Sequence, residues 1–528
     1  MAQSASKPEQ QTSVKETLTS IIIAFAMAFV FRGFVIEAFV IPTGSMAPTL
    51  LGAHMSFKSP YSGYEWTEGP KEYADRVTQS VPLAVQPNIT ATDPMTGMKI
   101  GPRNMPRNWG DRIFVMKYLY SVYDPKRWDV VVFKNPSRPG ENYIKRLIGL
   151  PNEMIALIDG DVFVRPVQPG EDPETLARDL RWEGDKWHVA RKPEAAQRAM
   201  WQLVFSSEYA PLSNPSRQFR PPWVPSSSTA RDWDVEGKDY TYSGQAPTSL
   251  AWDASNRLVD RVPYNEQSYR GSEFPAGDLR LSMGVRPGSE GQRVAAVVNA
   301  RGHEFRAEVE GSTAILTMRP ATPDAPWKEL ARAELARPLA AGKVTNIDFW
   351  HVDQSLQLFI DDRRVVAAEY DWSPSERLLH STGYDLQAVQ GMGHHFLVRP
   401  ENYRSSGARF EFSGGPFTLY RVALSRDIYY TPALYRGEKD GLPAKATAPS
   451  STAFLNQDQF FTLGDNSPMS LDARLWGTPD PWVAEIDPTP GVVHRDLLIG
   501  KAFFVYFPAP KRSGVRFAPN VGDMRFIW

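Results

Sequence analysis

Residues 34–50 read Phe-Val-Ile-Glu-Ala-Phe-Val-Ile-Pro-Thr-Gly-Ser-Met-Ala-Pro-Thr-Leu. The first eight are rich in the β-branched and aromatic side chains that favour strands. Gly44 and the prolines on either side of it then force a bend, so we expect a strand that runs into a sharp turn carrying Ser45. A serine on such a turn can project its hydroxyl toward converging backbone N–H groups, as an oxyanion hole requires. Serine also populates ordinary turns, so Ser45 is a candidate nucleophile only if the chain supplies a base.

The segment before this turn is strongly apolar. Residues 18–31 are almost all apolar, and residues 14–33 are predicted to form one transmembrane helix, because a span needs roughly 20 residues. Residues 1–13 are polar and are predicted to be a disordered tail. No small-x-small cleavage site follows directly, which favours an anchor over a cleaved secretion signal. The charges that flank the helix are too balanced to set its orientation.

The overall composition narrows the classes of function. The chain has 528 residues with a net charge of -1, so no global field would attract a nucleic acid, and no such partner is expected. It has no cysteine, which excludes disulfides, thiolate metal sites and cysteine nucleophiles. Its 45 prolines and 37 glycines favour many short strands joined by tight turns. We therefore expect a mainly β protein.

A base for Ser45 has to be found among the remaining residue types. None of the eight histidines lies in a segment suited to place an imidazole beside a serine, and no His-Glu-x-x-His occurs, so neither a histidine triad nor a metal site is predicted. A lysine base must be buried to lower its pKa, at about 1.4 kcal/mol per unit. Residues 142–151 have strand character, and a period of two places Lys145 on one face with Tyr143 and Leu147. Taken alone, Lys145 is more readily interpreted as an ordinary strand lysine that reaches solvent.

A third segment, residues 461–477, combines a strand end with a dense cluster of small polar and charged groups. Together with the earlier segments it resembles the type I signal peptidases, the Ser/Lys proteases that release secreted proteins from their leader peptides. The resemblance covers about a third of the chain. It comprises the apolar helix and, in the family's order, Pro42-Thr-Gly-Ser-Met-Ala-Pro-Thr-Leu50, Gly110-Asp-Arg-Ile113, Tyr143-Ile-Lys-Arg-Leu-Ile-Gly-Leu-Pro151 and Gly464-Asp-Asn through Asp472-Ala-Arg-Leu-Trp-Gly477.

The resemblance implies a role for each matching residue. Ser45 would be the nucleophile and Lys145 its general base, without a cofactor. The Ser45 N–H and the Thr43 hydroxyl would stabilise the oxyanion, and Ser470 would hold the lysine side chain. The remaining matches would support the site: Asp465, Asn466, Asp472 and Arg474. The chain departs from the pattern at Thr43, where many relatives have serine, and at Asn152-Glu153 and Ser467-Pro-Met469, but no departure removes a reacting group.

The sequence predicts a catalytic core enlarged by two insertions. The core would comprise residues 34–164 and 454–528, with an irregular loop or flap at 51–109. The second insertion, residues 165–453, is predicted to contain a helix at 193–209, a linker at 221–228 and a β-sandwich at about 230–435. Alternating segments such as 278–285 and 417–424, and a hairpin turn at Asp361-Asp-Arg363, resemble the jelly rolls of the concanavalin and laminin-G class.

The expected protein is thus mainly β, with a signal-peptidase-type catalytic domain behind one transmembrane helix and a large inserted sandwich. It would cleave exported preproteins at the surface of a lipid bilayer, as a single-pass protein of the cytoplasmic membrane with its catalytic domain on the extracytoplasmic side. The inserted sandwich would serve as a scaffold or bind an unidentified protein or carbohydrate partner. The alternatives are a self-cleaving Ser/Lys repressor protease and a membrane-anchored β-sandwich binding protein whose catalytic core is degenerate.

Overall fold

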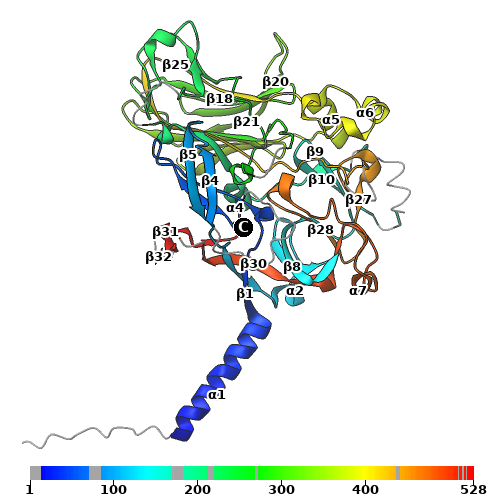
Figure 1. Ribbon diagram of the computed structural model, residues 1–528. Helices are drawn as coiled ribbons and strands as arrows, with labels where there is room; N and C mark the ends of the chain where they lie inside the picture. The colour runs from blue at the N-terminus through cyan, green and yellow to red at the C-terminus, as the bar shows by residue number, and fades with distance from the viewer. Residues whose placement is uncertain are drawn as a thin grey trace, which may run out of the picture.

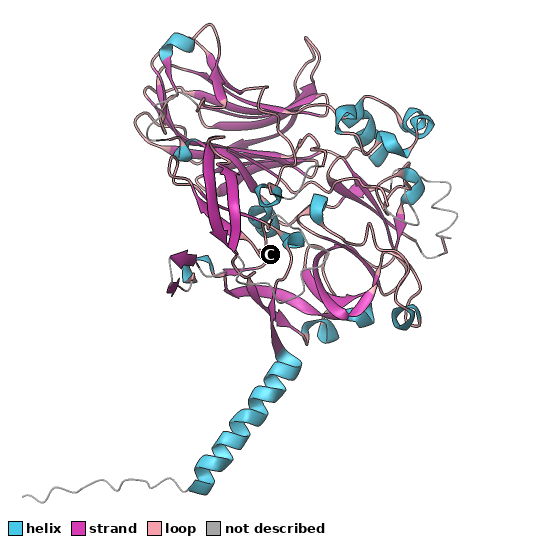
Figure 2. Cartoon of the chain, viewed as in Figure 1, coloured by secondary structure: helices cyan, strands magenta, loops and turns pink. Residues whose placement is uncertain are grey.

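The computed structural model confirms a mainly β protein with one apolar helix at its N-terminal side (Figures 1 and 2). Sheets form a lower and an upper layer in Figure 1, and the helix stands away from both. The predicted tail, residues 1–13, lies outside the described residues. The structure describes residues 14–70, 85–168, 170–171, 182–184, 186–211, 219–267, 271–435, 441–508, 511–513, 516–518 and 520–528.

The N-terminal helix α1 spans Val14–Val30 and continues as a π-helical turn, η1 (Phe31–Val35). The most apolar 18-residue window of this 22-residue segment has a mean hydropathy of 2.1, and none of that window is buried inside the protein. By length and composition this segment can cross a bilayer. It passes directly into β1 (Ile36–Val40), so the membrane-length helix is joined to a sheet without a linker.

The first sheet joins the early part of the chain to strands that lie after residue 458. Its central strands are β7 and β8, which form a hairpin, and β28 and β30 from the end of the chain flank that hairpin. All pairs are antiparallel, in the order β1, β6 (Arg112–Met116), β30 (Leu498–Phe507), β7 (Val130–Asn135), β8 (Arg138–Gly149), β28 (Gln459–Leu463) and β29 (Val493–His494), with β33 (Arg525–Phe526) on β30. The near-continuous apolar run Val130–Phe133 is buried on both faces.

A smaller sheet lies beside the first and contacts the insertion. Its order is β11 (His188–Val189), β10 (Asp161–Pro166), β9 (Glu153–Ile158) and β27 (Ala453–Phe454). One of its faces packs against Leu378 and Leu386, which lie on α5 (Pro374–Thr382) and α6 (Leu386–Met392). Two further short helices are α2 (Leu119–Val122) and α7 (Pro481–Ala484).

The first insertion is not the irregular loop that the sequence predicts. Its described residues form two hairpins, β2 (Met55–Lys58) with β3 (Glu65–Glu68) and β4 (Val85–Thr92) with β5 (Lys99–Pro106). They enclose a small core that includes Phe57, Trp66, Ile89 and Ile100. The prediction was wrong because prolines and glycines interrupt the alternation of these apolar residues, which meet only once the hairpins pair.

The second insertion contains the predicted β-sandwich (Figure 1). Apolar side chains of two sheets fill its core, among them Phe305, Phe349, Phe410 and Leu424. One sheet runs β14 (Trp233–Asp234), β15 (Tyr240–Tyr242), β26 (Phe417–Arg426), β17 (Leu279–Pro287), β22 (Thr345–Val352), β23 (Ser355–Ile360) and β24 (Arg363–Glu369), with β12 (Gln202–Ser206) on β26. The other runs β13 (Trp223–Pro225), β16 (Thr248–Trp252), β25 (Gly407–Ser413), β18 (Arg293–Ala300), β19 (His303–Glu310), β20 (Thr313–Pro320) and β21 (Lys328–Glu334).

A separate hairpin, β31 (Lys511–Ser513) with β32 (Arg516–Ala518), lies near the C-terminus.

Three local predictions for this insertion have different outcomes. The helix expected at 193–209 is only α4 (Glu194–Met200), because the residues after it form β12 on β26 and tertiary pairing overrides helix propensity. The linker expected at 221–228 contains β13, which tolerates a proline because it is an edge strand. The hairpin turn at Asp361-Asp362 is confirmed, and both residues have positive φ, at 47° and 64°.

Buried ion pairs fasten the sandwich to the smaller sheet. Asp159 and Asp161 come from the β9–β10 hairpin, and Arg377 of α5 donates to both, at 3.2 and 2.7 Å. Arg301, between β18 and β19, lies 2.6 Å from Asp159 and 2.6 Å from Asp278. All five side chains are buried, so removing one partner would leave an uncompensated charge inside the protein.

We predict that Arg377→Met lowers the free energy of unfolding by about 3–5 kcal/mol, because it leaves the buried Asp161 carboxylate without its ion-pair partner and removes one of the two arginines that bind Asp159. Arg332→Met is the matched control, since Arg332 pairs with Glu329 on an exposed strand, and it should leave that free energy unchanged. Urea unfolding of the two variants measures the difference. An equal effect of both substitutions would contradict a role for the buried pairs in docking the sandwich.

Candidate active site

Ser45 lies on a short 3₁₀ turn, η2 (Gly44–Met46), that follows β1. The turn is closed by a hydrogen bond from the Ala47 N–H to the Gly44 carbonyl at 3.0 Å. Ser45 is only 7% exposed, although it is polar. A buried hydroxyl needs a partner, so the group that approaches its oxygen decides what the residue can do.

Lys145 is that partner. It lies on β8 between β7 and β28, is 3% exposed, and its Nζ is 2.8 Å from Ser45 Oγ. The Ile144 carbonyl accepts a second hydrogen bond from Nζ at 3.0 Å, and the ring of Tyr143 lies 5.0 Å from the same nitrogen. Two residues that are 100 positions apart in the chain therefore meet within hydrogen-bond reach.

The environment of Lys145 favours its neutral form. Burial lowers the pKa of Lys145 to about 8, because the ammonium loses its water. The carboxylates of Asp472 and Asp465 oppose this shift, and the Arg474 guanidinium adds to it. A lysine in this state is about half neutral near pH 8, so its lone pair is available to accept a proton.

The two nearby carboxylates are held by arginines. Arg146 Nε and Nη2 donate to Asp465 at 2.8 and 2.6 Å, and Arg474 Nε and Nη2 donate to Asp472 at 2.8 Å each. The Gly464 N–H also donates to Asp472, at 3.1 Å. All four charged side chains are essentially inaccessible. Each pair is bidentate, which fixes the carboxylates in orientation and leaves their charge largely neutralised close to Lys145.

Asn466 connects this segment to the turn that carries Ser45. Its backbone N–H donates to the Ser45 carbonyl at 3.0 Å, and its side-chain Nδ2 donates to the Gly44 carbonyl at 2.9 Å. Asn466 itself is fully buried. These two bonds hold the peptide groups on either side of the Ser45 Cα, so the contacts of Asn466 with the turn are made to its main chain.

Ser470 and Thr43 lie near the dyad, but neither makes the contact that the resemblance implies. Ser470 Oγ is buried and has no hydrogen-bond partner among the residues that the structure describes. Thr43 directly precedes η2 in an extended conformation and makes no side-chain capping bond to the turn. The role of Ser470 toward Lys145 and that of Thr43 toward an oxyanion therefore stay predictions.

Sequence reasoning assigned no role to three further residues of this site. Arg146 follows Lys145 directly and points to the opposite side of β8, where it meets Asp465; the alternation of a strand could have indicated this. Tyr264 and Asn265 come from the second insertion and contact the Ser45 turn. No local pattern marks them, because the contact depends on how the insertion folds back.

A cluster of buried carboxylates outside this site has the geometry of a metal site but is already neutralised. The acidic oxygens of three residues lie within 4.8 Å of one another: Asp161, Asp278 and Asp353. Each is paired with a cation at 2.5–2.7 Å, namely Arg377, Arg301 and Lys192 respectively. The three cations already supply the positive charge that a metal ion would bring. The cluster therefore belongs to the buried ion pairs that join the sandwich to the smaller sheet.

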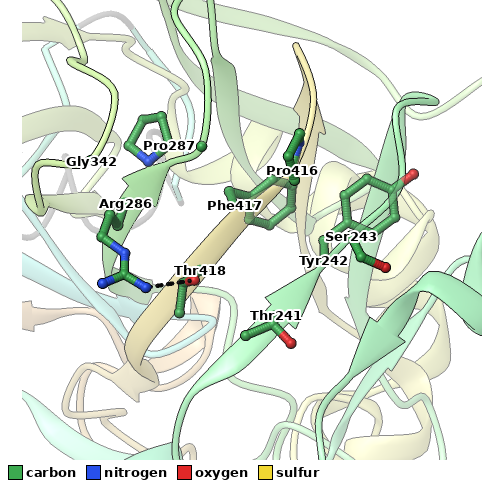
Figure 3. A pocket seen from close by; sticks show the side chains of 10 residues that line it. Thr241, Tyr242, Ser243, Arg286, Pro287, Gly342, Pro416, Phe417 and Thr418 are labelled. Atoms are coloured by element: carbon green, nitrogen blue, oxygen red, sulfur yellow. Dashed lines mark hydrogen bonds between the residues drawn. The ribbon is translucent and has the colours of Figure 1, made fainter.

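A pocket of about 340 Å³ lies on the sandwich, beside the last residues of β15 and β17 and the first residues of β26 (Figure 3). Tyr242, Phe417 and Pro416 form its apolar wall, and the guanidinium of Arg286 donates to Thr418 Oγ1 at 3.3 Å. Arg286 is exposed, so no buried charge marks a ligand position here. A protein or carbohydrate partner of the sandwich stays a prediction.

The packing around Gly464 predicts a local effect on the Ser45 turn. A Cβ at this position would lie 2.4 Å from the Ser45 carbonyl oxygen and 2.2 Å from Ser470 Oγ. We expect Gly464→Ala to displace the turn and to lower the free energy of unfolding by about 1–3 kcal/mol, measured by urea unfolding. Gly477 ends the same motif and has open space around its Cβ position, so Gly477→Ala is the control and should be neutral. Similar unfolding curves for the two variants would contradict the packing.

Comparisons with known proteins agree with the motifs. A family model described as signal peptidase, peptidase S26, matches residues 92–193, which include Lys145 but not Ser45. Signal peptidase I of Rickettsia typhi is 29% identical over 152 residues, covering 29% of this chain and 44% of that protein. Signal peptidase I of Rickettsia bellii is 28% identical over 146 residues, covering 28% and 37%. The chain thus spans less than half the length of these curated relatives.

Solved structures resemble the sandwich only distantly. The carbohydrate-binding module CBM66 from Bacillus subtilis is 11% identical with a TM-score of 0.22, covering 38% of this chain and 94% of that one. Beta-agarase A in complex with oligoagarose is 10% identical with a TM-score of 0.28, covering 43% and 92%. Likenesses at this level carry no conclusion about ligands. The family match and the curated relatives confirm the resemblance that the motifs predict: this chain is similar to the signal peptidase I proteins of the S26 family.

Proposed function

We propose that this protein is a membrane-bound serine endopeptidase that removes signal peptides from exported preproteins, with Ser45 as nucleophile and Lys145 as general base. The observation that carries the proposal is the 2.8 Å contact between Lys145 Nζ and Ser45 Oγ inside a buried site. A serine hydroxyl is a weak nucleophile at neutral pH unless a base lies within hydrogen-bond reach. Lysine can be that base here because burial lowers its pKa.

The proposed reaction follows from this pair. The neutral amine of Lys145 takes the proton of Ser45 as Oγ attacks the scissile carbonyl carbon. The resulting oxyanion would be stabilised by the Ser45 N–H and the Thr43 hydroxyl. The Lys145 ammonium then gives its proton to the leaving amine, and an acyl-enzyme remains on Ser45. Lys145 next takes a proton from water, whose oxygen attacks the ester carbonyl. The ester C–O bond then breaks, the second product leaves as a carboxylic acid, and Lys145 returns the proton to Ser45 Oγ.

The supporting residues would keep the dyad aligned. Asp465 and Asp472 are fixed by their arginines, so they adjust the pKa of Lys145 without competing for its proton. Asn466 holds the backbone of the Ser45 turn. Ser470 is proposed to hold the lysine side chain in place. Its buried hydroxyl lies beside Gly464, so a shift of the Gly464 segment would also move this hydroxyl.

The position of the dyad in the chain supports a substrate at the membrane. Ser45 lies ten residues after the apolar helical segment ends at Val35, which limits its distance from the end of that segment to about 35 Å. A preprotein whose leader is in the bilayer would reach the site as an extended chain, and strand addition is the natural mode of reading it. We place the catalytic domain on the extracytoplasmic side of the cytoplasmic membrane, where exported preproteins emerge.

The direct test is cleavage of a purified preprotein in detergent. Wild type should cut after the leader, whereas Ser45→Ala and Lys145→Met should be inactive yet folded, with at least about a thousandfold loss, because nucleophile and base act as a unit. Lys58→Met is the control, since Lys58 forms an exposed pair with Glu65 and should retain full activity. A folded, inert wild type would instead favour a membrane-anchored binding protein with a degenerate core.

The pKa of Lys145 sets the pH dependence. Because the base must be neutral, kcat/KM should rise with pH to a plateau with a midpoint near 8, and should fall about tenfold per unit well below it. Asp472 raises the pKa of Lys145, so Asp472→Asn should move the midpoint to lower pH. Initial rates from pH 5 to 9.5 measure both. A midpoint that stays in place or moves upward in this variant would contradict the assignment of Lys145 as base.

A further inference from the structure

A segment of the inserted sandwich domain reaches the turn that carries Ser45. This segment is the short 3₁₀ turn η5 (Pro263–Asn265), which lies between β16 and β17 in the chain. Tyr264 and Asn265 are 2% and 3% exposed, and both are covered by the catalytic domain and the first insertion. Residues more than 200 positions away from Ser45 therefore form part of its immediate surroundings.

Asn265 completes the hydrogen bonds of Asn466. The Asn265 Nδ2 donates to Asn466 Oδ1 at 2.7 Å, and the Asn466 Nδ2 donates back to Asn265 Oδ1 at 2.8 Å. The second hydrogen of Asn466 Nδ2 is used by the Gly44 carbonyl at 2.9 Å. The polar atoms of the buried Asn466 side chain thus all have hydrogen-bond partners in one orientation. In that orientation its Nδ2 also bonds to the Ser45 turn.

Tyr264 confines the same turn from another side. Its ring lies so close to Gly44 that a Cβ there would be 2.1 Å from Tyr264 Cε1. Its hydroxyl donates to the Ala53 carbonyl at 2.6 Å, just beyond the turn. Apolar contacts with Ala47 add to this packing. The side chain of Tyr264 therefore contacts residues before and after Ser45 and restricts the movement of the main chain between them.

The η5 segment is itself anchored on both sides. Arg261, two residues before the turn, accepts a hydrogen bond at its carbonyl from Arg426 of β26, at 2.8 Å. The Tyr264 carbonyl accepts from the Gly69 N–H at 2.7 Å, and Gln267 Nε2 donates to Glu68 at 2.6 Å. The segment thus connects the sandwich, the first insertion and the Ser45 turn.

We propose that Asn265 and Tyr264 are positioning residues for the peptidase reaction, so that the inserted sandwich domain is a working part of the active site. Asn265 acts through Asn466, and Tyr264 acts through the backbone of the Gly44–Met46 turn. Together they keep Ser45 Oγ at hydrogen-bond distance from Lys145 Nζ. A displacement of about 1 Å at reacting atoms can cost about a hundredfold in rate, so the clamp controls the chemical step. This inference rests on the function proposed above.

The test uses near-isosteric changes in the full-length protein in detergent. Asn265→Asp keeps the acceptor for Asn466 Nδ2 but removes the donor to Asn466 Oδ1, and Tyr264→Phe removes only the hydroxyl that holds Ala53. We expect kcat to fall at least about tenfold in Asn265→Asp and by a smaller but measurable factor, about threefold or more, in Tyr264→Phe. KM should change by less than about twofold, because neither residue is proposed to bind substrate.

The control is Gln292→Glu, an equally buried amide in the sandwich whose Nε2 donates to the Ser413 carbonyl at 2.9 Å, away from the Ser45 turn. It should lower the melting temperature and leave kcat of the folded protein unchanged. A double variant, Asn265→Ala with Asn466→Ala, compared with its two single variants, adds a readout that a general loss of stability does not affect. If the amides act as a unit, its kcat should fall no further than that of the worse single variant.

The outcomes separate the two proposals. If wild type shows no Ser45-dependent cleavage, the proposed function fails and this inference fails with it. If wild type cleaves through Ser45 but folded Asn265→Asp and Tyr264→Phe retain wild-type kcat, the inference alone is overturned. If Asn265→Asp does not fold, Tyr264→Phe decides: a lowered kcat at unchanged KM supports the positioning role, and an unchanged kcat refutes it.

Discussion

The contact between a buried lysine amine and a serine hydroxyl organises the structure around it. Lys145 Nζ lies 2.8 Å from Ser45 Oγ, and burial lowers the pKa of the amine to about 8. An isolated lysine would not tolerate this position in its charged form, and an isolated serine would be unreactive. The surrounding elements therefore have to exclude water from the amine while keeping the serine turn in place. The antiparallel hairpin of β7 and β8 excludes water from the amine. The segment after β28 keeps the serine turn in place.

The placement of charge near Lys145 shows how this balance is kept. Two carboxylates would pull the pKa of the amine back toward its usual value if they stood alone. Arg146 and Arg474 bind them in bidentate fashion, which weakens that effect and leaves desolvation dominant. Arginine suits this task because it stays charged when buried and its fork matches a carboxylate. The effect of the polar cluster after β28 on the pKa of the lysine is therefore smaller than that of burial.

The sequence predicted the fold class and the apolar helix from local patterns, whereas it paired Ser45 with Lys145 only through the resemblance to the signal peptidases, since neither residue's local pattern is decisive alone. The helix is a continuous apolar run, Ser45 follows a strand and a proline-bounded turn, and Lys145 alternates with apolar neighbours. The hairpins of the first insertion and strand β12 were not predicted, because their pairing depends on partners far away in the chain. Asn265 and Tyr264 could not be found for the same reason: an amide and an aromatic ring in a loop carry no signal until the insertion is folded against the Ser45 turn. In this protein the insertion is therefore joined to the chemistry through contacts that only the three-dimensional structure reveals.

The most direct measurement is the ionisation of Lys145 itself. Lysine labelled with ¹³C at Cε can be introduced into the full-length protein, and the Lys145 resonance assigned by its loss in Lys145→Met. Its chemical shift followed by NMR from pH 6 to 11 reports the pKa without requiring a substrate. A titration midpoint near 8 is the predicted result. A midpoint at the ordinary lysine value, above 10, would leave about 1% or less of the amine neutral even at pH 8, and would contradict its role as the base for Ser45.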